Sequence, residues 1–407
     1  MKCRHCHHSL DLSLVDLGCM PPSNAYLSST SDFSKEQKYP LKVKVCQHCW
    51  LVQTEDFTRA DELFTEDYAY FSSTSTSWLQ HAAAYVQKAI SDLRLNSASF
   101  VVELAANDGY LLRNFQQAGI PNLGIEPTKA TAEAARSLGL TIISEFFGQT
   151  FAADLVNQYP KADLVVANNV LAHVPDINDF VTGIAIMLAD HGVCSFEFPH
   201  LLNLLNEHQF DTIYHEHYSY LSLLSVQKIL LHSGLKVYKV EQLPTHGGSL
   251  RVWACLAEAE KVVESSVEAM LQQEIEFGLA DADVYRKFQQ EVNQIADALK
   301  FFLQQQHQAG RKVVAYGAAA KGNTLLNYAG IGVELLPVVF DAARSKQGKF
   351  LPGSHIPIKH PEELPDYKPD LVLVLPWNLS TEIRAQLKPQ LADSCELIVA
   401  IPRLKYL

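Results

Sequence analysis

The chain has 407 residues, 48% of them hydrophobic and 19% charged, and a formal net charge of −12. A chain of this length and composition is not disordered and folds into two or three domains, because single hydrophobic cores stop growing at about 250 residues. The negative charge argues against broad nucleic-acid or membrane-surface binding, which needs basic patches, and no apolar run reaches the roughly 18 residues of a membrane helix.

Two C-x-x-C pairs, separated by 39 residues, mark the N-terminal part of the chain. Four thiolates make a closed tetrahedral site, which is the pattern of structural zinc. The turn-rich residues 9–45 need a bound metal of this kind to stay folded. We therefore expect a zinc-binding module over residues 1–60, with the ligands Cys3, Cys6, Cys46 and Cys49. The neighbouring histidines remain alternative ligands: His5, His7, His8 and His48. The first residues, MKCRHC, lack the apolar core of a signal peptide, so we expect a cytoplasmic protein.

Residues 61–98 indicate helices, and a strand, a small-residue turn and a helix follow them. An apolar run leads into Glu103, the turn covers residues 105–109, and the next strand ends on Glu126. This order places backbone N–H groups and a helix N-terminus at one point, and an acidic strand tip suits a ribose with two free hydroxyls. The turn reads Asn107-Asp108-Gly109 instead of G-x-G-x-x-G, which favours S-adenosylmethionine (SAM), because SAM has no pyrophosphate. The alternative is an ordinary βαβ unit without a ligand.

Further strands and helices extend this unit to a domain over residues 61–260. A buried strand over 163–169 ends on two asparagines, a helix covers 177–188 and another strand covers 193–198. Such alternation implies a doubly wound α/β sheet with its ligand at the carboxyl ends of the strands. The adenine is expected after the third strand, near residues 145–147. The expected cofactor-binding residues are Glu103, Ala105, Asn107, Gly109, Tyr110, Leu111, Glu126, Pro127, Glu145, Phe146, Phe147, Asn168 and Asn169.

Residues 211–220, DTIYHEHYSY, concentrate two histidines, a glutamate and three tyrosines. The H-E-H order lacks the spacing of an H-E-x-x-H zinc protease. Histidine titrates near neutrality and a glutamate can orient it, so the cluster fits proton transfer. The alternative is a polar, hydrogen-bonded turn. His173 follows the strand that ends on Asn168 and Asn169, and is expected to point into the same cleft.

A long helical connection over residues 260–306 precedes a second α/β unit that begins at Arg311. One strand runs into the turn Gly317–Thr324 and a helix, and the strand over 338–341 again ends on an acid. The turn does not match the P-loop motif, in which the lysine follows the second glycine, but it is still a candidate binding site for a phosphate or a ribose. We expect a second, Rossmann-like domain over residues 261–407. The alternative is a domain that serves only as a scaffold.

Together these segments resemble the sugar C-methyltransferases that act on nucleotide-linked 4-keto-6-deoxysugars, such as the C-3 methylating enzymes of branched deoxysugar pathways. The resemblance covers nearly the whole chain, and the segments that carry it besides the four cysteines are ELAANDGYLL, GIEP, NNVLAHVPD, FEFPH, YHEHYSY, THGGSLRV and AYGAAAKGNTLLNY. It implies that the first module binds zinc, the middle domain binds SAM and the last domain helps to bind the nucleotide sugar. Family members more often have Cys where Ala106 stands, which is a backbone-contact position.

The resemblance also implies roles for single residues. His217 is the expected base that removes the proton from C-3 beside the C-4 ketone, with Glu216 as its orienter. Tyr214 and His173 are expected to hydrogen-bond the enolate oxygen or the substrate, and Tyr68 to border the transferring methyl. Tyr214 and His217 can exchange roles as far as the sequence shows. The expected substrate-binding residues are Tyr68, His173, Tyr214, His246, Gly317, Lys321 and Asn323.

Two other functions stay open from the sequence. An O- or N-methyltransferase of a small molecule would need no base for a C–H bond. A non-catalytic nucleotide-sugar-binding protein would not turn over SAM. The sugar, the nucleotide (dTDP or GDP), the stereochemistry at C-3 and the choice between monomer and homodimer are also left open.

Overall fold

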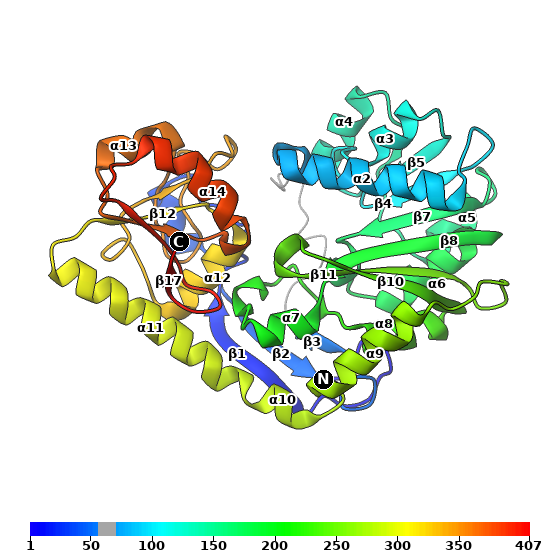
Figure 1. The fold of residues 1–407 in the computed structure, drawn as a ribbon, viewed down its shortest axis with the longest axis horizontal. Helices are drawn as coiled ribbons and strands as arrows, with labels where there is room; N and C mark the ends of the chain where they lie inside the picture. The colour runs from blue at the N-terminus through cyan, green and yellow to red at the C-terminus, as the bar shows by residue number, and fades with distance from the viewer. Residues whose placement is uncertain (56–70) are drawn as a thin grey trace.

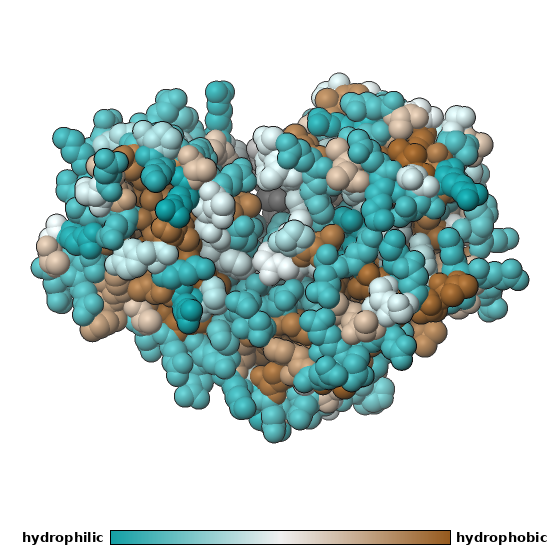
Figure 2. Space-filling view, viewed as in Figure 1, coloured by the Kyte–Doolittle hydropathy of each residue, from teal (hydrophilic) through white to brown (hydrophobic). Residues whose placement is uncertain are grey.

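The computed structural model describes residues 1–55 and 71–407, which form two lobes and a smaller sheet between them (Figure 1). A seven-stranded sheet lies in one lobe, a six-stranded sheet in the other, and the four-stranded N-terminal sheet at the base of both. The space-filling view shows a notch between the lobes on the side opposite that base (Figure 2). Tyr68 falls outside the described residues, so its predicted role stays a prediction. Among the described helices, none has the length and apolar character needed to cross a membrane.

The N-terminal sheet is antiparallel and contains one strand from the middle of the chain. Its strands in spatial order are β1 (Leu12–Met20), β2 (Tyr39–Val45), β3 (Val52–Thr54) and β9 (Ser219–Tyr220). The first C-x-x-C pair precedes β1, and the second lies in the turn between β2 and β3. Because β9 belongs to the DTIYHEHYSY segment, the predicted catalytic segment and the zinc module share one sheet.

Part of the core beneath the N-terminal sheet is supplied by the C-terminal part of the chain. Leu14 of β1 belongs to the same buried cluster as Leu299 of α11 (Phe288–Gln308) and Leu325 of α12 (Ala320–Ala329). Burial of apolar surface is the main favourable term in folding, and a small turn-rich module has little such surface to bury by itself. The N-terminal module therefore depends on its neighbours as well as on its cysteines.

The central lobe contains the predicted doubly wound sheet. Its strands in spatial order are β10 (Leu235–Leu243), β11 (Ser249–Leu256), β8 (Leu188–Pro199), β7 (Ala162–Asn168), β4 (Val101–Leu104), β5 (Asn122–Ile125) and β6 (Ile142–Ile143). The strands from β8 to β6 run parallel, and β11 runs antiparallel to both of its neighbours. The carboxyl ends of β4, β5 and β7 therefore meet at one edge of this sheet.

Successive residues of the central strands enter opposite cores, as expected for a sheet that is buried on both faces. Val101 and Val102 belong to different buried clusters, and Leu164 and Val165 divide between them in the same way. The helices on one face are α5 (Gln149–Leu155), α6 (Ile177–Met187), α8 (Leu223–His232) and α9 (Ser265–Phe277), and those on the other are α2 (Thr76–Leu93), α3 (Leu112–Gln117) and α4 (Lys129–Ser137). The predicted α/β fold class is confirmed.

The C-terminal lobe contains a second, mainly parallel sheet, as predicted. Its strands in spatial order are β14 (Ile358–Lys359), β13 (Val339–Phe340), β12 (Val313–Tyr316), β15 (Leu371–Val374), β16 (Glu396–Val399) and β17 (Lys405–Tyr406). Its helices include α12, α13 (Leu364–Tyr367) and α14 (Ser380–Leu387). The predicted helical connection consists of α9, α10 (Ala282–Arg286) and α11. The domain boundaries 1–60, 61–260 and 261–407 stay predictions.

Candidate active site

The four predicted zinc ligands converge at one point. Their Sγ atoms all lie within 4.8 Å of one another, with 3.5 Å between Cys3 and Cys49 and 3.4 Å between Cys6 and Cys46. Four sulfurs placed tetrahedrally at 2.3 Å from a zinc ion are about 3.8 Å apart, so the arrangement fits zinc. The thiols are free rather than paired in disulfides.

The nearby histidines surround this cluster without completing it. His5 donates from Nδ1 to Oδ1 of Asn178 in α6 (2.8 Å), and is thereby engaged with the central lobe. The exposed rings of His8 and His48 stack with 3.8 Å between their centroids and, with Cys6, form an overlapping set of possible ligands. The four cysteines are the more enclosed set and fill all four positions of a structural site.

The turn after β4 has an unusual backbone. The φ angle is positive at Ala105 (54°), Asn107 (50°) and Gly109 (78°). A Cβ on Gly109 would lie 2.3 Å from Cδ1 of Leu140, so only glycine fits there. Non-glycine residues with positive φ cost roughly 1–3 kcal/mol each and cluster at functional sites, which supports this turn as a place where the backbone contacts a ligand.

Glu126, at the end of β5, holds this turn in place. Its Oε2 accepts the backbone N–H of Asn107 (2.8 Å), and its Oε1 accepts the backbone N–H of Thr128 (2.9 Å). Each carboxylate oxygen has a second lone pair, so both can still accept from the two hydroxyls of a ribose. Tyr110 and Leu111 are buried beneath the turn, and Pro127 beside it is half-buried.

Buried polar atoms gather where β4 and β7 end. Within residues 1–55 and 71–407, Oε2 of Glu103, Oδ1 of Asn168 and Nδ2 of Asn169 have no hydrogen-bond partner. Burial, and then the charge of Glu126, raises the pKa of Glu103 well above its ordinary value. Unpartnered buried polar groups are rare in native proteins and call for a ligand or water, so this edge fits a polar cofactor such as SAM.

The three residues expected beside the adenine differ in their surroundings. Phe147 packs edge-on against Phe180 of α6, with 5.5 Å between the ring centroids. Phe146 is 53% exposed, and Glu145 is exposed as well. Phe147 thus packs against the protein core, whereas the exposed ring of Phe146 is free to stack on the adenine.

The imidazole of His217 is oriented by a backbone carbonyl. Its Nδ1 donates to the carbonyl oxygen of Thr212 in η4 (Phe210–Thr212) over 2.8 Å. A carbonyl only accepts, so Nδ1 carries the proton and Nε2 the lone pair. The ring of Tyr214 lies against this imidazole, 3.9 Å between centroids. Burial, followed by the influence of His173, lowers the pKa of His217 well below its ordinary value, so the ring is neutral at pH 7.

Glu216 and His173 flank this ring. The carboxylate of Glu216 accepts from Nδ2 of Asn24 (3.0 Å), so the orienting position expected for Glu216 is taken by the carbonyl of Thr212. His173, in η3 (Leu171–His173), donates from Nδ1 to the backbone carbonyl of Glu216 (2.7 Å), and its ring lies 4.7 Å from that of His217. Burial lowers the pKa of His173 to about 4 and raises that of Glu216.

The C-terminal lobe reaches this cluster through Lys321 and Trp377. Lys321 donates to Oδ1 of Asn378 (3.1 Å), and its Nζ lies 4.7 Å from the ring centroid of Trp377. The indole N–H of Trp377 donates to Oδ2 of Asp211 (2.7 Å), a buried residue of the predicted catalytic segment. The charge of Lys321 contributes, after burial and the influence of His173, to the lowered pKa of His217. The first turn of α12 therefore faces the predicted base, and the predicted turn Gly317–Thr324 is only a short loop, because the helix begins at Ala320.

Three other residues predicted to bind substrate lie in two turns, at His246 and Gly317, and in helix α12, at Asn323. His246 lies in η5 (Thr245–Gly247) with a positive φ of 56°, and its ring is 5.0 Å from that of Trp78. Gly317 has a φ of 90°, and a Cβ there would meet the ring of Pro376 at 2.4 Å. Asn323 donates to the carbonyl of Ser23 (2.6 Å), which directs part of its side chain to the N-terminal module.

Several residues at this junction were not predicted. Asn24 and Trp377 contact the predicted catalytic segment and carry no sequence signal of their own, and Thr212 lies within that segment but had no predicted role. Glu197, at the end of β8, accepts from Nε2 of His81 (2.9 Å), from Arg251 (2.5 Å) and from Thr245 (3.1 Å). Burial acts to raise the pKa of Glu197, but its hydrogen bond with His81 and the charge of Arg251 outweigh it and hold the pKa below its ordinary value. Asp211, Glu197, Thr245 and Arg251 lie within the segments DTIYHEHYSY, FEFPH and THGGSLRV, but no role was predicted for any of them.

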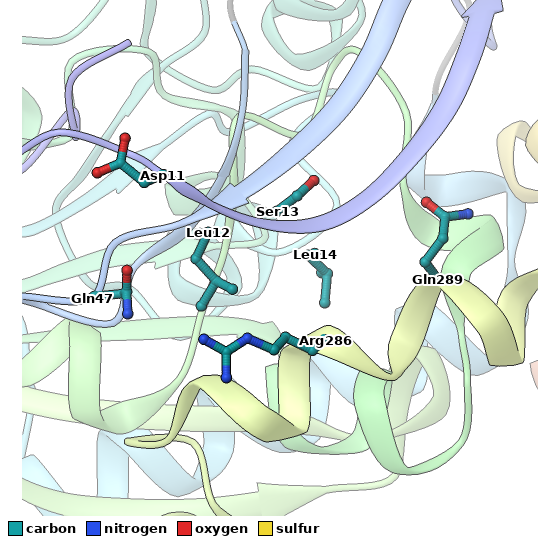
Figure 3. A pocket seen from close by; sticks show the side chains of 7 residues that line it. All are labelled: Asp11, Leu12, Ser13, Leu14, Gln47, Arg286 and Gln289. Carbon is teal, nitrogen blue, oxygen red and sulfur yellow. The ribbon is translucent and has the colours of Figure 1, made fainter.

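A separate hollow lies on the outside of the molecule, between β1 and α10 (Figure 3). Asp11 and Arg286 on its walls are exposed, and Gln289 is half-buried. These side chains lie near solvent, whereas the buried and strained groups gather where the lobes meet. The junction is therefore the candidate active site.

Comparisons with known proteins agree with this assignment. The model of the "C-methyltransferase C-terminal domain" matches residues 244–402, that of the "Methyltransferase domain" matches residues 78–240, and that of the "Putative zinc binding domain" matches residues 3–64. The C-methyltransferase NovU from Streptomyces niveus is 34% identical over 401 residues, which is 98% of this chain and 95% of that protein. The chain belongs to this C-methyltransferase family.

Two solved structures resemble parts of this C-methyltransferase at lower sequence identity than NovU does. Magnesium protoporphyrin IX methyltransferase from Synechocystis PCC 6803, with bound SAM, is 17% identical with a TM-score of 0.34, over 43% of this chain and 78% of that one. The PH0226 protein from Pyrococcus horikoshii OT3 is 12% identical with a TM-score of 0.37, over 49% and 99%. The family assignment confirms the predicted enzyme class, a SAM-dependent C-methyltransferase, and its cofactors SAM and zinc.

Proposed function

We propose that this C-methyltransferase transfers the methyl group of SAM to C-3 of a nucleotide-linked 4-keto-deoxysugar through an enolate. A base removes the C-3 proton, and its electron pair moves onto the C-4 oxygen. C-3 of the enolate then forms a bond to the methyl carbon as the sulfur–methyl bond breaks. The observation that carries this proposal is a buried, neutral histidine at the junction of the lobes, because a C–H beside a ketone ionises only with a positioned base.

The base in this proposal is His217. Its Nδ1–H bond to the carbonyl of Thr212 (2.8 Å) leaves the lone pair on Nε2, the form that accepts a proton. Once protonated, the imidazolium keeps that hydrogen bond, so the ring does not have to rotate during the step. General-base catalysis of this kind contributes about 10²–10⁴-fold to a rate. An O- or N-methyltransferase would need no base for a C–H bond, and family membership also favours transfer to carbon.

Tyr214 is the proposed donor to the enolate oxygen. Its ring lies 3.9 Å from that of His217, so a substrate beside the base also lies beside the phenol. His173, which donates from Nδ1 to the backbone carbonyl of Glu216 beside the imidazole of His217, is proposed to contact the substrate. A donor aimed at the developing charge commonly contributes about 10²–10³-fold. His246, between Trp78 and the C-terminal lobe, is proposed to contact the sugar.

The cofactor is proposed to lie along the carboxyl edge of the central sheet, between Glu103 and His173. Glu126 would accept from the ribose, since its Oε2 bonds the backbone N–H of Asn107 in the strained turn that follows β4, and its Oε1 bonds that of Thr128 just after β5. The nucleotide part of the substrate is proposed to bind the turn Gly317–Thr324, where Lys321 supplies a partly buried positive charge. The two ligands thus enter from opposite lobes, which lets both reach the catalytic segment.

Exchange of the C-3 proton tests this proposal directly. The wild-type enzyme, incubated in deuterium oxide with a nucleotide-linked 4-ketosugar and no SAM, is expected to introduce deuterium at C-3. His217→Asn should lower this exchange by about 10²–10⁴-fold and still bind SAM. His307→Asn, a matched change at an exposed position of α11, should leave exchange unaltered. Exchange by His217→Asn at the wild-type rate would overturn the role of His217 and leave Tyr214 as the base.

A further inference from the structure

The zinc module contacts the catalytic segment directly through β3. The backbone N–H of Thr54 donates to the carbonyl of Tyr218 (3.1 Å), and its hydroxyl donates to the carbonyl of His217 (3.2 Å). In the register of the two strands, Val52 pairs with Tyr220 and Gln53 with Ser219. The backbone of the predicted base is therefore held by a residue from the other end of the chain.

The same short strand contacts the zinc ligands. Gln53, completely buried, donates from Nε2 to Sγ of Cys3 (3.3 Å) and accepts on Oε1 from the backbone N–H of Arg4 (2.9 Å). Thr54, the next residue, is 2% exposed. Two consecutive side chains of β3 thus reach a zinc thiolate and the carbonyl of His217.

Neither strand can hold this arrangement by itself. Within the described residues β9 has two residues and pairs only with β3, which has three residues and follows directly on the second cysteine pair. Strand pairs this short have no stability of their own in water. The rest of the segment is anchored to the central lobe, where the N–H of Tyr218 donates to the carbonyl of Ala172 (2.8 Å). The position of β3 is therefore set by its pairing with β2 and by the cysteine knuckle that joins these two strands.

We propose that Gln53 and Thr54 are positioning residues through which the zinc knuckles hold the backbone of His217, and so its imidazole, in the catalytic position. The inference rests on the proposed role of His217 as the base. Zinc in this enzyme then does more than keep a small module folded. It fixes one wall of the active site, because a reacting group displaced by about 1 Å can lose roughly 10²-fold in rate.

The test compares Thr54→Val with Thr54→Ser in the full-length, zinc-loaded enzyme. Valine has a similar size but no hydroxyl, whereas serine keeps the hydroxyl. Thr54→Val should lower the rate constant for C-3 deuterium exchange by about tenfold, with unchanged zinc content and SAM affinity. Thr54→Ser should exchange at nearly the wild-type rate. Equal loss in both variants would mean that only packing matters, and wild-type exchange in Thr54→Val would also overturn the inference.

Amide hydrogen exchange of the peptide that covers residues 214–221, followed by mass spectrometry, separates this inference from the proposed function. Its protection should fall in Thr54→Val and after zinc is removed with a chelator, whatever residue is the base. Gln53→Met, which lacks the donor to Cys3, should lose zinc faster to a chelator and show the same loss of protection. Unchanged protection in all three samples would overturn the inference. Wild-type C-3 exchange by His217→Asn would instead overturn the role of His217 as the base, whereas a loss of protection in these samples would still show that the zinc module holds this segment.

Discussion

Glu126→Gln tests how SAM is held, because it changes one atom at the centre of the proposed ribose site. The carboxylate is 5% exposed, and each of its oxygens already accepts one backbone N–H, from Asn107 (2.8 Å) and Thr128 (2.9 Å). Glutamine keeps one acceptor and turns an NH2 group toward the other N–H and the other ribose hydroxyl. Hydrogen bonds to a charged group are worth about 1.5–3 kcal/mol each. Since about 1.4 kcal/mol corresponds to tenfold in affinity, SAM binding should weaken by roughly 10- to 150-fold.

Isothermal titration calorimetry with SAM and with S-adenosylhomocysteine measures this loss, which should be similar for both because both carry the ribose. Glu133→Gln, an exposed position on α4, is the matched control and should bind as the wild type does. Thermal unfolding of both variants without ligand separates weaker binding from a damaged turn. Wild-type affinity in Glu126→Gln would refute the placement of the ribose beside β5.

Three further predictions follow from the same geometry. The purified enzyme should contain about one zinc per chain by metal analysis, and Cys46→Ser should lower both the zinc content and the melting temperature. Lys321→Ala should raise the KM for the nucleotide sugar by tenfold or more, while the exposed Lys388→Ala should not; an unchanged KM would make the C-terminal lobe a scaffold. Burial and the charge of Glu126 raise the pKa of Glu103, and the cationic sulfonium of SAM favours the ionised form of this carboxyl group. The affinity for SAM, measured by calorimetry, should therefore rise as the pH rises through the pKa of Glu103. The same measurement on Glu103→Gln should show no such rise.

Local sequence patterns predicted the central fold and the zinc ligands well. Val101 and Val102 enter opposite cores, which is the two-sided burial expected from a continuous apolar run. The four cysteines meet because two C-x-x-C turns can close on one ion. In contrast, β1 and β2 lie in residues 9–45, where the sequence indicated turns. For β1 the reason is visible in its pairing, where register shifts between Ser13 and Val15 and between Asp16 and Cys19 interrupt the alternation that marks a strand, whereas β2 does alternate and was missed.

Contacts between distant segments had no comparable signal. Asn24 and Glu216 are 192 residues apart, and Thr54 and His217 are 163 apart, yet each pair is in hydrogen-bond contact. Glu216 was expected to orient His217 because the two are neighbours in the sequence. In a loop, however, adjacent side chains commonly point in different directions, and here a carbonyl four residues before Glu216 bonds the imidazole instead. Sequence indicated which residues gather at the site, but the partner of each is set by tertiary packing.

In the proposed reaction, the position of the predicted catalytic segment would explain why the enzyme has three modules. In the proposed reaction the methyl donor lies on the central sheet and the acceptor is held by the C-terminal lobe, so the base has to stand where both meet. The segment that carries it is too short to hold its own shape, and it is tied at one end to Trp377 through Asp211 and at the other to β3 through Thr54. Loss of either contact should therefore impair the same step, proton removal, even though the two contacts belong to different lobes.

A nucleotide bound at Lys321 would also affect the base electrostatically. The charge of Lys321 already contributes to the low pKa of His217, and the negative charge of a phosphate would offset it. Substrate binding would then strengthen the base at the moment when a C–H bond has to be broken.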